Sequence, residues 1–507
     1  MIRRRTITSY VWNSVSGNKM VILSNCIRNF FRKFELIGNS VQGENPAPDN
    51  PQEIKSAGRK SKNLLIENIS VFTVQDNIAY IPLPEGHETK LYTMLIQKKP
   101  GENDDVGFTC GFYDKSNMTA TYSAPCLQAG NLVTGNGIVN SKIGVNHFVC
   151  FSPADSRFFD IYNVMYAEGK ETTLDYEPYG YFFDVKITGK NLLSNKPADW
   201  QIGKKTSWSA TPEYPIDANV PDISNALIFI NVKPSTKYTF INKLTNKIWV
   251  NRIIERDVNG IGVRNHGLYI DETLNKNKYD FTTKDNTANI IFQIKKVDVT
   301  ELLSSDIKSI KVMLVEGDAN ENAIFEPYTE QFAKIALDEP LRGIGEYKDV
   351  LTKDGVVRKI KRIVFDENTP FKEYNAPVQV KTTSFISGTT IKDATGETGI
   401  EVMSDRFKAK DRGFDRYDEE CITLFGKNIF VRFNKDKNIN TAEALTEWLK
   451  QNPLTVDYVL AEPVTEPLPE SVQAQLQALH SENGTTHVFV DSGEVEAGIN
   501  IEYKYKS

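Results

Sequence analysis

Metal-binding and redox-active side chains are scarce in this sequence. Its 507 residues include five cysteines and five histidines. The cysteines are odd in number and form no Cys-x-x-Cys pair, so the sequence predicts neither a disulfide framework nor a zinc ribbon. No two histidines have the spacing of a metal-binding pair on a helix. We therefore expect no metal and no other cofactor, and we interpret the cysteines as core thiols of a reducing compartment.

Long apolar runs are absent too. No stretch approaches the roughly 18 apolar residues that a membrane-spanning helix requires. Thr6, Thr8 and Ser9 interrupt the segment after the basic start of the chain, where a secretory signal peptide needs an unbroken apolar run. These patterns predict a soluble protein that neither inserts into membranes nor is exported by a signal peptide.

The motifs of common enzyme classes are missing as well. The sequence has no phosphate-binding loop, no dinucleotide-binding glycine pattern, no zinc-protease helix and no nucleophile elbow. Carboxylate pairs suited to glycoside hydrolysis arise in many places, because the chain has 66 acidic residues. The densest acidic cluster, at residues 411–420, is interleaved with arginines and is typical of a solvated, salt-bridged face. We predict no catalytic residue and no enzyme activity.

Neither sign of charge dominates the chain, which has a formal net charge of −6. This balance gives no general attraction to nucleic acid, which requires clustered lysine and arginine. The first 34 residues are an exception, because they are basic and contain no acidic residue. Aromatic side chains accompany these charges and favour docking onto a partner protein, with a flexible tail or a nucleic-acid contact as alternatives. The residues predicted to dock are Arg3, Arg4, Arg5, Trp12, Phe30 and Phe31.

Two segments of the chain share a beginning and an end. Asn63-Leu64-Leu65 opens the first and Asn191-Leu192-Leu193 opens the second, each directly after a lysine. Chance is a poor explanation for the similar spacing at their ends, so we interpret the segments as an internal repeat. At the ends, Val164-Met165-Tyr166-Ala167-Glu168-Gly169 and Tyr176-Glu177-Pro178-Tyr179 correspond to Val312-Met313-Leu314-Val315-Glu316-Gly317 and Phe325-Glu326-Pro327-Tyr328.

Both copies are filled with short runs of β-branched and aromatic residues separated by turn formers. No helical period persists in either copy. The predicted fold is therefore mainly β, with two tandem modules that are each a β-sandwich or jelly roll. In each copy the Val-Met run should be a late core strand, and Glu-Pro-Tyr should be the exit that packs a tyrosine against the module.

The pattern changes from about residue 335. Asp354-Gly355 predicts a tight hairpin, and Asn440 with Glu443 resembles a capping box before a helix that Asn452-Pro453 ends. A second helix is predicted over residues 469–480, so the C-terminal part should be a smaller α+β domain. The predicted domains are a basic anchor and Pro-rich linker (1–57), module 1 (58–182), module 2 (183–332) and the α+β domain (333–507).

Tryptophans mark the candidate ligand site. Sugar-binding proteins stack pyranose faces on exposed aromatic rings while polar neighbours bind the hydroxyl groups. Trp200, Trp208 and Trp249 all lie in the second copy of the repeat, and the first two flank a polar stretch. We predict that these three residues bind a glycan. The alternative is packing in the core or at its rim.

Several segments resemble one family of proteins. Residues 34–42 with the following Pro-Asp-Asn-Pro linker, the Asn-Leu-Leu starts and Glu-Pro-Tyr exits, residues 341–349 and residues 460–469 are similar to segments of minor structural and tail proteins of phages and prophages of Gram-positive bacteria. The resemblance covers most of the chain from about residue 34. It implies a virion protein, assembled in the host cytoplasm, that binds other tail or baseplate proteins as a symmetric oligomer. It also implies that the two β-sandwich (jelly-roll) modules are carbohydrate-binding-like. It carries over no catalytic residue.

Repeat and resemblance together predict a structural protein of a phage tail, baseplate or tail fibre whose β modules attach to a glycan of the host surface. The first alternative is a purely structural baseplate or fibre subunit without receptor contact. The second alternative is a cell-wall glycan hydrolase. Self-association is expected, as a trimer or a hexamer.

Overall fold

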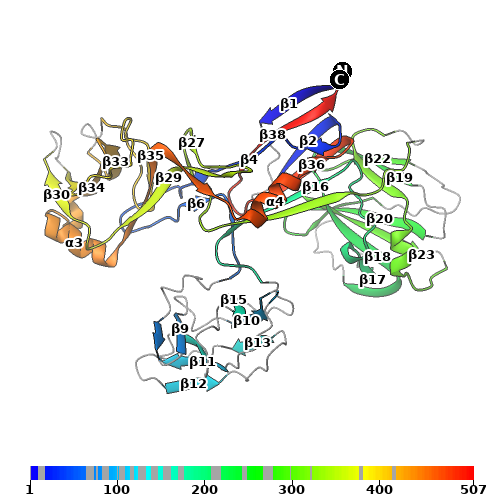
Figure 1. Ribbon diagram of the computed structural model, residues 1–507, viewed down its shortest axis with the longest axis horizontal. Coiled ribbons are helices and arrows are strands. Elements are labelled where there is room, and N and C mark those ends of the chain that lie inside the picture. Colours follow the sequence, from blue (N-terminus) through cyan, green and yellow to red (C-terminus); the bar gives the residue numbers. More distant parts are fainter. Residues whose placement is uncertain are drawn as a thin grey trace. The chain divides into compact units, whose positions relative to one another are not determined.

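The computed structural model of the chain is mostly β, as the sequence predicts, with several antiparallel sheets (Figure 1). No helix in the described residues is long and apolar enough to cross a membrane. The structure describes residues 2–8, 18–63, 73–75, 78–82, 91–99, 101, 109–114, 119–123, 133–138, 147–151, 161–168, 176–206, 219–242, 248–266, 278–296, 298–319, 323–375, 381–413 and 418–507.

The chain divides into two compact units. One comprises Met1–Gly58, Phe183–Ile335 and Leu341–Ser507, and the other comprises Arg59–Phe182 with Ala336–Pro340. The sequence predicts that residues 1–57 and residues 333–507 belong to different domains. In the structure, Met1–Gly58 and Leu341–Ser507 are parts of the same compact unit.

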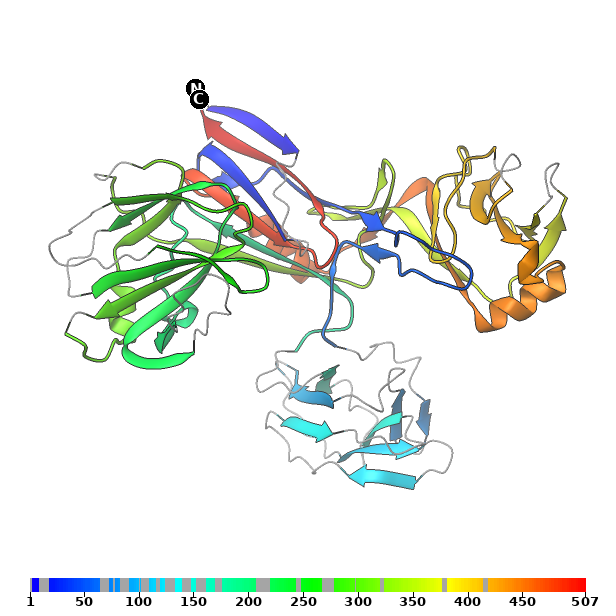
Figure 2. The ribbon, with the colours of Figure 1, turned by 180° about the vertical axis from the view of Figure 1, so that it is seen from behind.

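The two chain ends meet in the largest sheet. β2 (Asn18–Cys26) pairs with β37 (Gly484–Asp491), while β38 (Gly498–Lys506) pairs with β4 (Lys33–Ile37) and β1 (Ile2–Thr8). Figures 1 and 2 accordingly show both termini at one place. The strand order is β25 (Glu330–Leu337), β16 (Tyr181–Thr188), β37, β2, β38, β4, β28 (Val350–Leu351), β29 (Gly355–Phe365), β35 (Leu454–Pro467) and β32 (Val402–Ser404), with β7 (Arg59–Lys60) beside β16.

Alternating apolar residues hold these distant segments together. Leu36 lies opposite Ile499, and Phe34 lies opposite Ile501, and all four side chains are buried. Because successive side chains of a strand point to opposite faces, this alternation supplies one apolar face per strand. The N-terminal segment is thus built into a sheet, and it is not a separate anchor.

The two copies of the repeat have the same strand order. When the eight strands of each copy are numbered along the chain, both copies form a five-stranded sheet of order 5-4-7-2-1 and a three-stranded sheet of order 6-3-8. The first copy contains β8 (Thr73–Gln75), β9 (Ile78–Pro82), β10 (Leu91–Lys98), β11 (Thr109–Asp114), β12 (Thr119–Ser123), β13 (Val133–Ile138), β14 (His147–Phe151) and β15 (Tyr162–Glu168). The second contains β17 (Gln201–Lys205), β18 (Val220–Asn231), β19 (Lys237–Asn242), β20 (Ile248–Arg256), β21 (Gly262–His266), β22 (Lys278–Thr282), β23 (Asn289–Lys296) and β24 (Val312–Glu316), with the short helices η3 (Pro197–Asp199) and α2 (Ser304–Lys308).

In the second copy the two sheets enclose one core. Ile228 and Phe292 from the five-stranded sheet pack in the same cluster as Phe240 and Leu314 from the three-stranded sheet. The predicted late core strand is β24, which is buried over most of its length. Gly317 follows it with φ +83°, a backbone conformation that favours glycine and explains the end of the Val-Met-Leu-Val-Glu-Gly run.

The shared sequence motifs make equivalent contacts in both copies. The amide Nδ2 of Asn63 donates to Val164 O at 3.5 Å, and Nδ2 of Asn191 donates to Val312 O at 3.2 Å. The exits repeat as well. In the first copy the backbone N–H of Glu177 donates to the Met165 sulfur at 3.4 Å. In the second copy the backbone N–H of Glu326 donates to the Met313 sulfur at 3.1 Å. The Asn motif therefore joins the entry of each copy to its last strand, and the Glu-Pro-Tyr motif joins the exit to the same strand.

The predicted elements after residue 335 are present. A hairpin joins β28 to β29, closed by Thr352 N–H donating to Gly355 O at 2.8 Å. Helix α3 (Ala442–Gln451) ends before Asn452 as predicted, but Thr441 rather than Asn440 caps it. The other elements are α4 (Glu470–Ala478), η6 (Lys435–Lys437), the sheet of β30 (Phe371–Tyr374), β31 (Thr382–Ser387), β34 (Asn428–Asn434) and β33 (Cys421–Phe425), and the pairs β3 (Asn29–Phe30) with β36 (His480–Ser481), β5 (Ser40–Val41) with β6 (Lys55–Ser56), and β26 (Gly343–Ile344) with β27 (Tyr347–Lys348).

Candidate functional site

Of the three tryptophans predicted to bind a glycan, the structure describes Trp200 and Trp249. Trp200 is only 5% exposed and packs edge-on against Phe292 in the core, with its Nε1 donating to Ser194 O at 2.8 Å. Its indole face is therefore not available for stacking on a sugar. Trp249 is half-buried on β20, and Trp208 lies outside the described residues. Packing, the alternative interpretation, holds for Trp200.

The residues predicted to dock a partner also differ among themselves. Arg3, Arg4 and Arg5 are exposed on β1. Phe30 is 64% exposed and meets the ring of His480 edge-on, whereas Phe31 is buried and stacks on Phe34. Phe31 is therefore a core residue and not a docking residue. Trp12 lies outside the described residues.

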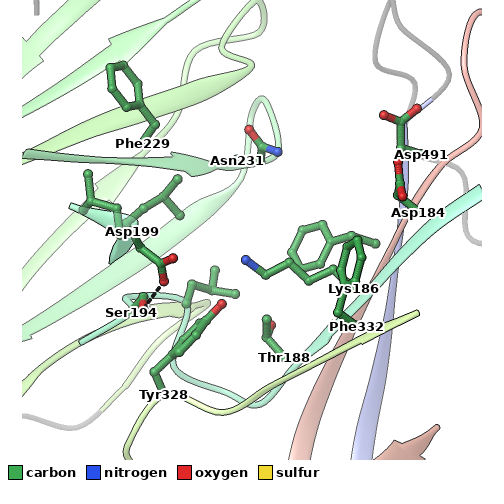
Figure 3. A pocket seen from close by; sticks show the side chains of 14 residues that line it. Asp184, Lys186, Thr188, Ser194, Asp199, Phe229, Asn231, Tyr328, Phe332 and Asp491 are labelled. Atoms are coloured by element: carbon green, nitrogen blue, oxygen red, sulfur yellow. Dashed lines mark hydrogen bonds between the residues drawn. The ribbon is translucent and has the colours of Figure 1, made fainter. Parts of the chain in front are cut away.

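A cavity of about 490 Å³ lies between the largest sheet and the second copy of the repeat, within one compact unit (Figure 3). A cavity of this size is in the range of small-molecule sites. Its lining is Asp184, Lys186, Thr188, Leu192, Ser194, Asp199, Ile228, Phe229, Ile230, Asn231, Tyr328, Phe332, Phe489 and Asp491.

Two strands of the largest sheet form one wall. Asp184, Lys186 and Thr188 alternate along β16, so they share a face of the sheet. The neighbouring strand β37 places Asp491 directly opposite Asp184 and Phe489 directly opposite Lys186. This wall therefore carries two carboxylates, an ammonium group, a hydroxyl group and an aromatic ring.

The other walls add aromatic rings that solvent can reach. Phe229 on β18 is 38% exposed although its neighbours Ile228 and Ile230 are buried in the core. Phe332 on β25 is 59% exposed, and Tyr328 is the last residue of the Glu-Pro-Tyr exit. The exit tyrosine of the second repeat thus lines the cavity.

An ion-pair network holds Tyr328 in place. Its hydroxyl donates to the Glu330 carboxylate at 2.6 Å, which also pairs with Lys186 at 3.3 Å and with Lys196. Burial by itself would raise the pKa of the Glu330 carboxyl, but the bonds from Lys196 and Tyr328 outweigh it and lower the pKa to about 2. Burial and the bond to Glu330 raise the pKa of the Tyr328 hydroxyl. The tyrosine is therefore a neutral, fixed ring, over which the Lys186 ammonium lies 5.6 Å from the centroid.

One buried hydroxyl in the cavity wall has no partner. Thr188 is 2% exposed, and no described residue makes a hydrogen bond with its Oγ1. Buried polar groups are nearly always hydrogen-bonded, and an unpaired one costs about 1–3 kcal/mol. Thr188 is consequently a group that a polar ligand in the cavity could satisfy.

This combination suits a polyhydroxylated ligand. Exposed rings provide flat apolar contact, while carboxylates, an amide and hydroxyls provide hydrogen bonds of fixed direction. No three His, Cys, Asp or Glu side chains in the described part of the chain are grouped so as to hold a metal ion.

A second polar cluster surrounds Glu255, which is fully buried on β20. Its carboxylate accepts hydrogen bonds from His266 Nε2 at 2.6 Å, Arg264 Nε at 2.7 Å and Thr287 Oγ1 at 2.6 Å. Burial alone would raise the pKa of Glu255, yet the bonds from His266 and Thr287 lower it to about 2. The Tyr279 hydroxyl lies 3.0 Å from His266 Nδ1, and burial raises the pKa of Tyr279. These hydrogen bonds join β20 to β21 and to the loop before β23.

Comparisons with known proteins add no family. No protein-family model matches the chain, and no curated protein matches it. Matching solved structures include the VP2 subviral particle of infectious bursal disease virus (8% identity, 99% of this chain, 80% of that chain, TM-score 0.11) and the Gx strain of the same virus (9%, 98%, 81%, TM-score 0.10). At such TM-scores the likeness carries no conclusion about fold or function.

Proposed function

We propose that this chain is a structural protein of a phage tail or baseplate, and that its cavity attaches the particle to a glycan of the host surface. The two copies of the repeat are two β-sandwich modules, inserted between strands of the largest sheet. The observation that carries the glycan part is the cavity, which combines four aromatic rings with carboxylate, amide and hydroxyl groups. The phage assignment rests on the resemblance of residues 34–42, 341–349 and 460–469 to tail proteins.

Binding of the full chain to a glycan array made from Gram-positive cell-wall fragments tests the glycan part. We expect binding that Phe229→Ala and Phe332→Ala weaken at least tenfold, because both remove exposed ring surface from the cavity. Phe425→Ala is the matched control, because Phe425 is also partly exposed but does not line the cavity. If all three variants bound the array as tightly as the parent chain, the cavity would not be the glycan site.

The particle assignment needs its own experiment. Antibodies against the purified chain, used on virions in electron microscopy, should label the tail tip or baseplate. Light scattering of the purified chain should give a trimer or a hexamer, because symmetric assembly multiplies weak attachment. We expect no release of reducing ends from purified cell wall. Labelling absent from the tail would contradict the structural role.

The purely structural subunit is the second candidate. The contacts of the Asn and Glu-Pro-Tyr motifs in both copies favour it, because they fasten the entry and the exit of each copy to its last strand without involving a ligand. If antibodies against the chain label the phage tail but the chain binds no fragment on the glycan array, the purely structural role is the correct one.

A further inference from the structure

The first strand of the chain lies at an edge of the largest sheet. β1 pairs with β38 along all seven of its residues, and no other described strand pairs with it. Figures 1 and 2 both show β1 as the outer strand of a ribbon that it forms with β38. The backbone N–H and C=O groups of alternate residues point to opposite edges of a strand, so part of those of β1 point away from β38. A further strand can therefore be added at this edge.

The ribbon of β1 and β38 is strongly basic. Its two strands contain five basic residues and one acidic residue, Glu502, and all five basic side chains are exposed. Arg4 lies directly opposite Lys504, and like charges in this arrangement destabilise a sheet. Glu502 lies 4.0 Å from Arg4 and 3.5 Å from Arg32, so one carboxylate is divided between two arginines. The ribbon therefore has an excess of positive charge.

The three consecutive arginines of β1 lie on both faces of this ribbon. Because successive side chains of a strand point to opposite faces, Arg3 and Arg5 share one face and Arg4 is on the other. A strand added beside β1 would place its own successive side chains in the same alternation. Three consecutive acidic residues in the added strand would therefore each lie beside one arginine.

Other occupants fit this edge less well. A second copy of the chain would set arginine against arginine if two β1 strands paired, and like charges directly opposite repel. Charged side chains on an exposed edge discourage the addition of most strands for this reason, and an acidic strand reverses the effect. Nucleic acid would meet the positive charge but would not pair with the backbone groups of the strand edge. Charge and backbone together therefore favour an extended acidic peptide segment.

We propose that β1 binds an extended acidic segment of a partner protein, which adds to the sheet as a strand and pairs its carboxylates with Arg3, Arg4 and Arg5. Backbone hydrogen bonds supply the affinity in strand addition, and the side chains supply the specificity. None of these three arginines lines the cavity, so docking at β1 does not depend on glycan binding.

The test measures binding of a synthetic peptide as long as β1 to the full chain by fluorescence anisotropy. The peptide, Val-Thr-Glu-Glu-Glu-Thr-Val, carries consecutive glutamates between residues that favour strands. Methylation of its backbone nitrogens should weaken binding at least tenfold, because it removes the donors that strand pairing needs. A peptide with lysine in place of glutamate should not bind. Hydrogen exchange of β1 amides should slow at least tenfold with the acidic peptide bound, while exchange in β30, the edge strand of another sheet, stays unchanged.

Variants of the chain separate charge recognition from folding. Arg4→Gln with Arg5→Gln should weaken peptide binding at least threefold, because exposed ion pairs are individually weak but two are lost. The melting temperature should stay unchanged, since exposed substitutions of this kind alter stability little. Lys308→Gln with Lys372→Gln is the charge-matched control, because both lysines are exposed and lie outside the ribbon. The control should bind the peptide as tightly as the parent chain does.

Each other outcome contradicts the proposal in a different way. Equal binding of the methylated and unmethylated peptides would show attraction by charge alone, and tighter binding of duplex DNA than of the peptide would make the ribbon a polyanion site. Self-association that protects the β1 amides, and that the acidic peptide does not reverse, would make a second copy the occupant. Failure of the acidic peptide to bind, or unchanged exchange in β1 when it is bound, would remove the docking edge altogether.

Discussion

Asn191 joins the start of the second repeat to its last strand, and replacing it by alanine should loosen that strand. Its Nδ2 donates to Val312 O at 3.2 Å and to Glu326 O at 3.1 Å, while its Oδ1 accepts from the N–H groups of Leu193 at 3.0 Å and Leu314 at 3.1 Å. Asn191→Ala removes all four bonds, and each buried backbone group left unpaired costs about 1–3 kcal/mol. Because water can enter the vacated space, we expect a loss of about 3–5 kcal/mol, below the full sum.

Hydrogen exchange is the appropriate assay, because a chain with two compact units need not unfold in one step. A loss of about 3–5 kcal/mol speeds amide exchange in β24 by roughly two to three and a half orders of magnitude, since every 1.4 kcal/mol is a factor of ten. Asn259→Ala, in an exposed turn, is the control. If the amides of β24 in Asn191→Ala exchanged at rates within about threefold of those in the parent chain, Asn191 would not be the residue that fastens the last strand of the repeat.

Glu255→Gln should destabilise the second repeat by about 3 kcal/mol at pH 7, because it breaks a buried charge network. Since the pKa of Glu255 is lowered to about 2, this stabilisation is fully present above the ordinary glutamate pKa of about 4.3. In urea titrations, the difference in stability between variant and parent chain should therefore shrink as the pH falls from about 4.3 toward 2. Thr441→Ala should cost about 1 kcal/mol in chemical denaturation, because Thr441 Oγ1 accepts the Ala444 N–H at 3.2 Å at the start of α3. Phe292→Ala, in the core beside Trp200 and Phe240, should cost about 3–5 kcal/mol, whereas the cavity variant Phe229→Ala should cost much less and act on ligand binding.

Local patterns predicted local structure well. The run Val312 to Glu316 was expected to be a late core strand because it is apolar and ends at a glycine, and it is β24. Helix α3 is ended by Asn452-Pro453, and the hairpin turns at Asp354-Gly355. Both signals lie within or next to the element that they predict, so a short stretch of sequence was sufficient. The pairing of β2 with β37 has no such signal, because it joins segments from opposite ends of the chain whose apolar alternation fits many partners.

Neither Trp200 nor Trp249 is among the residues that line the cavity. Tryptophan content suggested a ring-lined site in the second repeat, but Trp200 is in the core because its indole N–H finds a backbone acceptor there. The exit motif predicted only that Tyr328 packs against the module, and it gave no signal that this tyrosine lines a cavity. Asp184 and Asp491 carried no signal, because only the register of β16 with β37 brings them together.

The motifs common to the two copies and the polar wall of the cavity come from different parts of the structure. The motifs that fix each copy, its Asn start and Glu-Pro-Tyr exit, contact the last strand of that copy. The polar wall of the cavity comes instead from β16 and β37, outside the second copy, while Phe229 and Asn231 come from inside it. A change in the sheet can therefore alter the ligand without disturbing the module. It also follows that an excised second module would lack Asp184 and Asp491, so ligand binding has to be measured on the full chain.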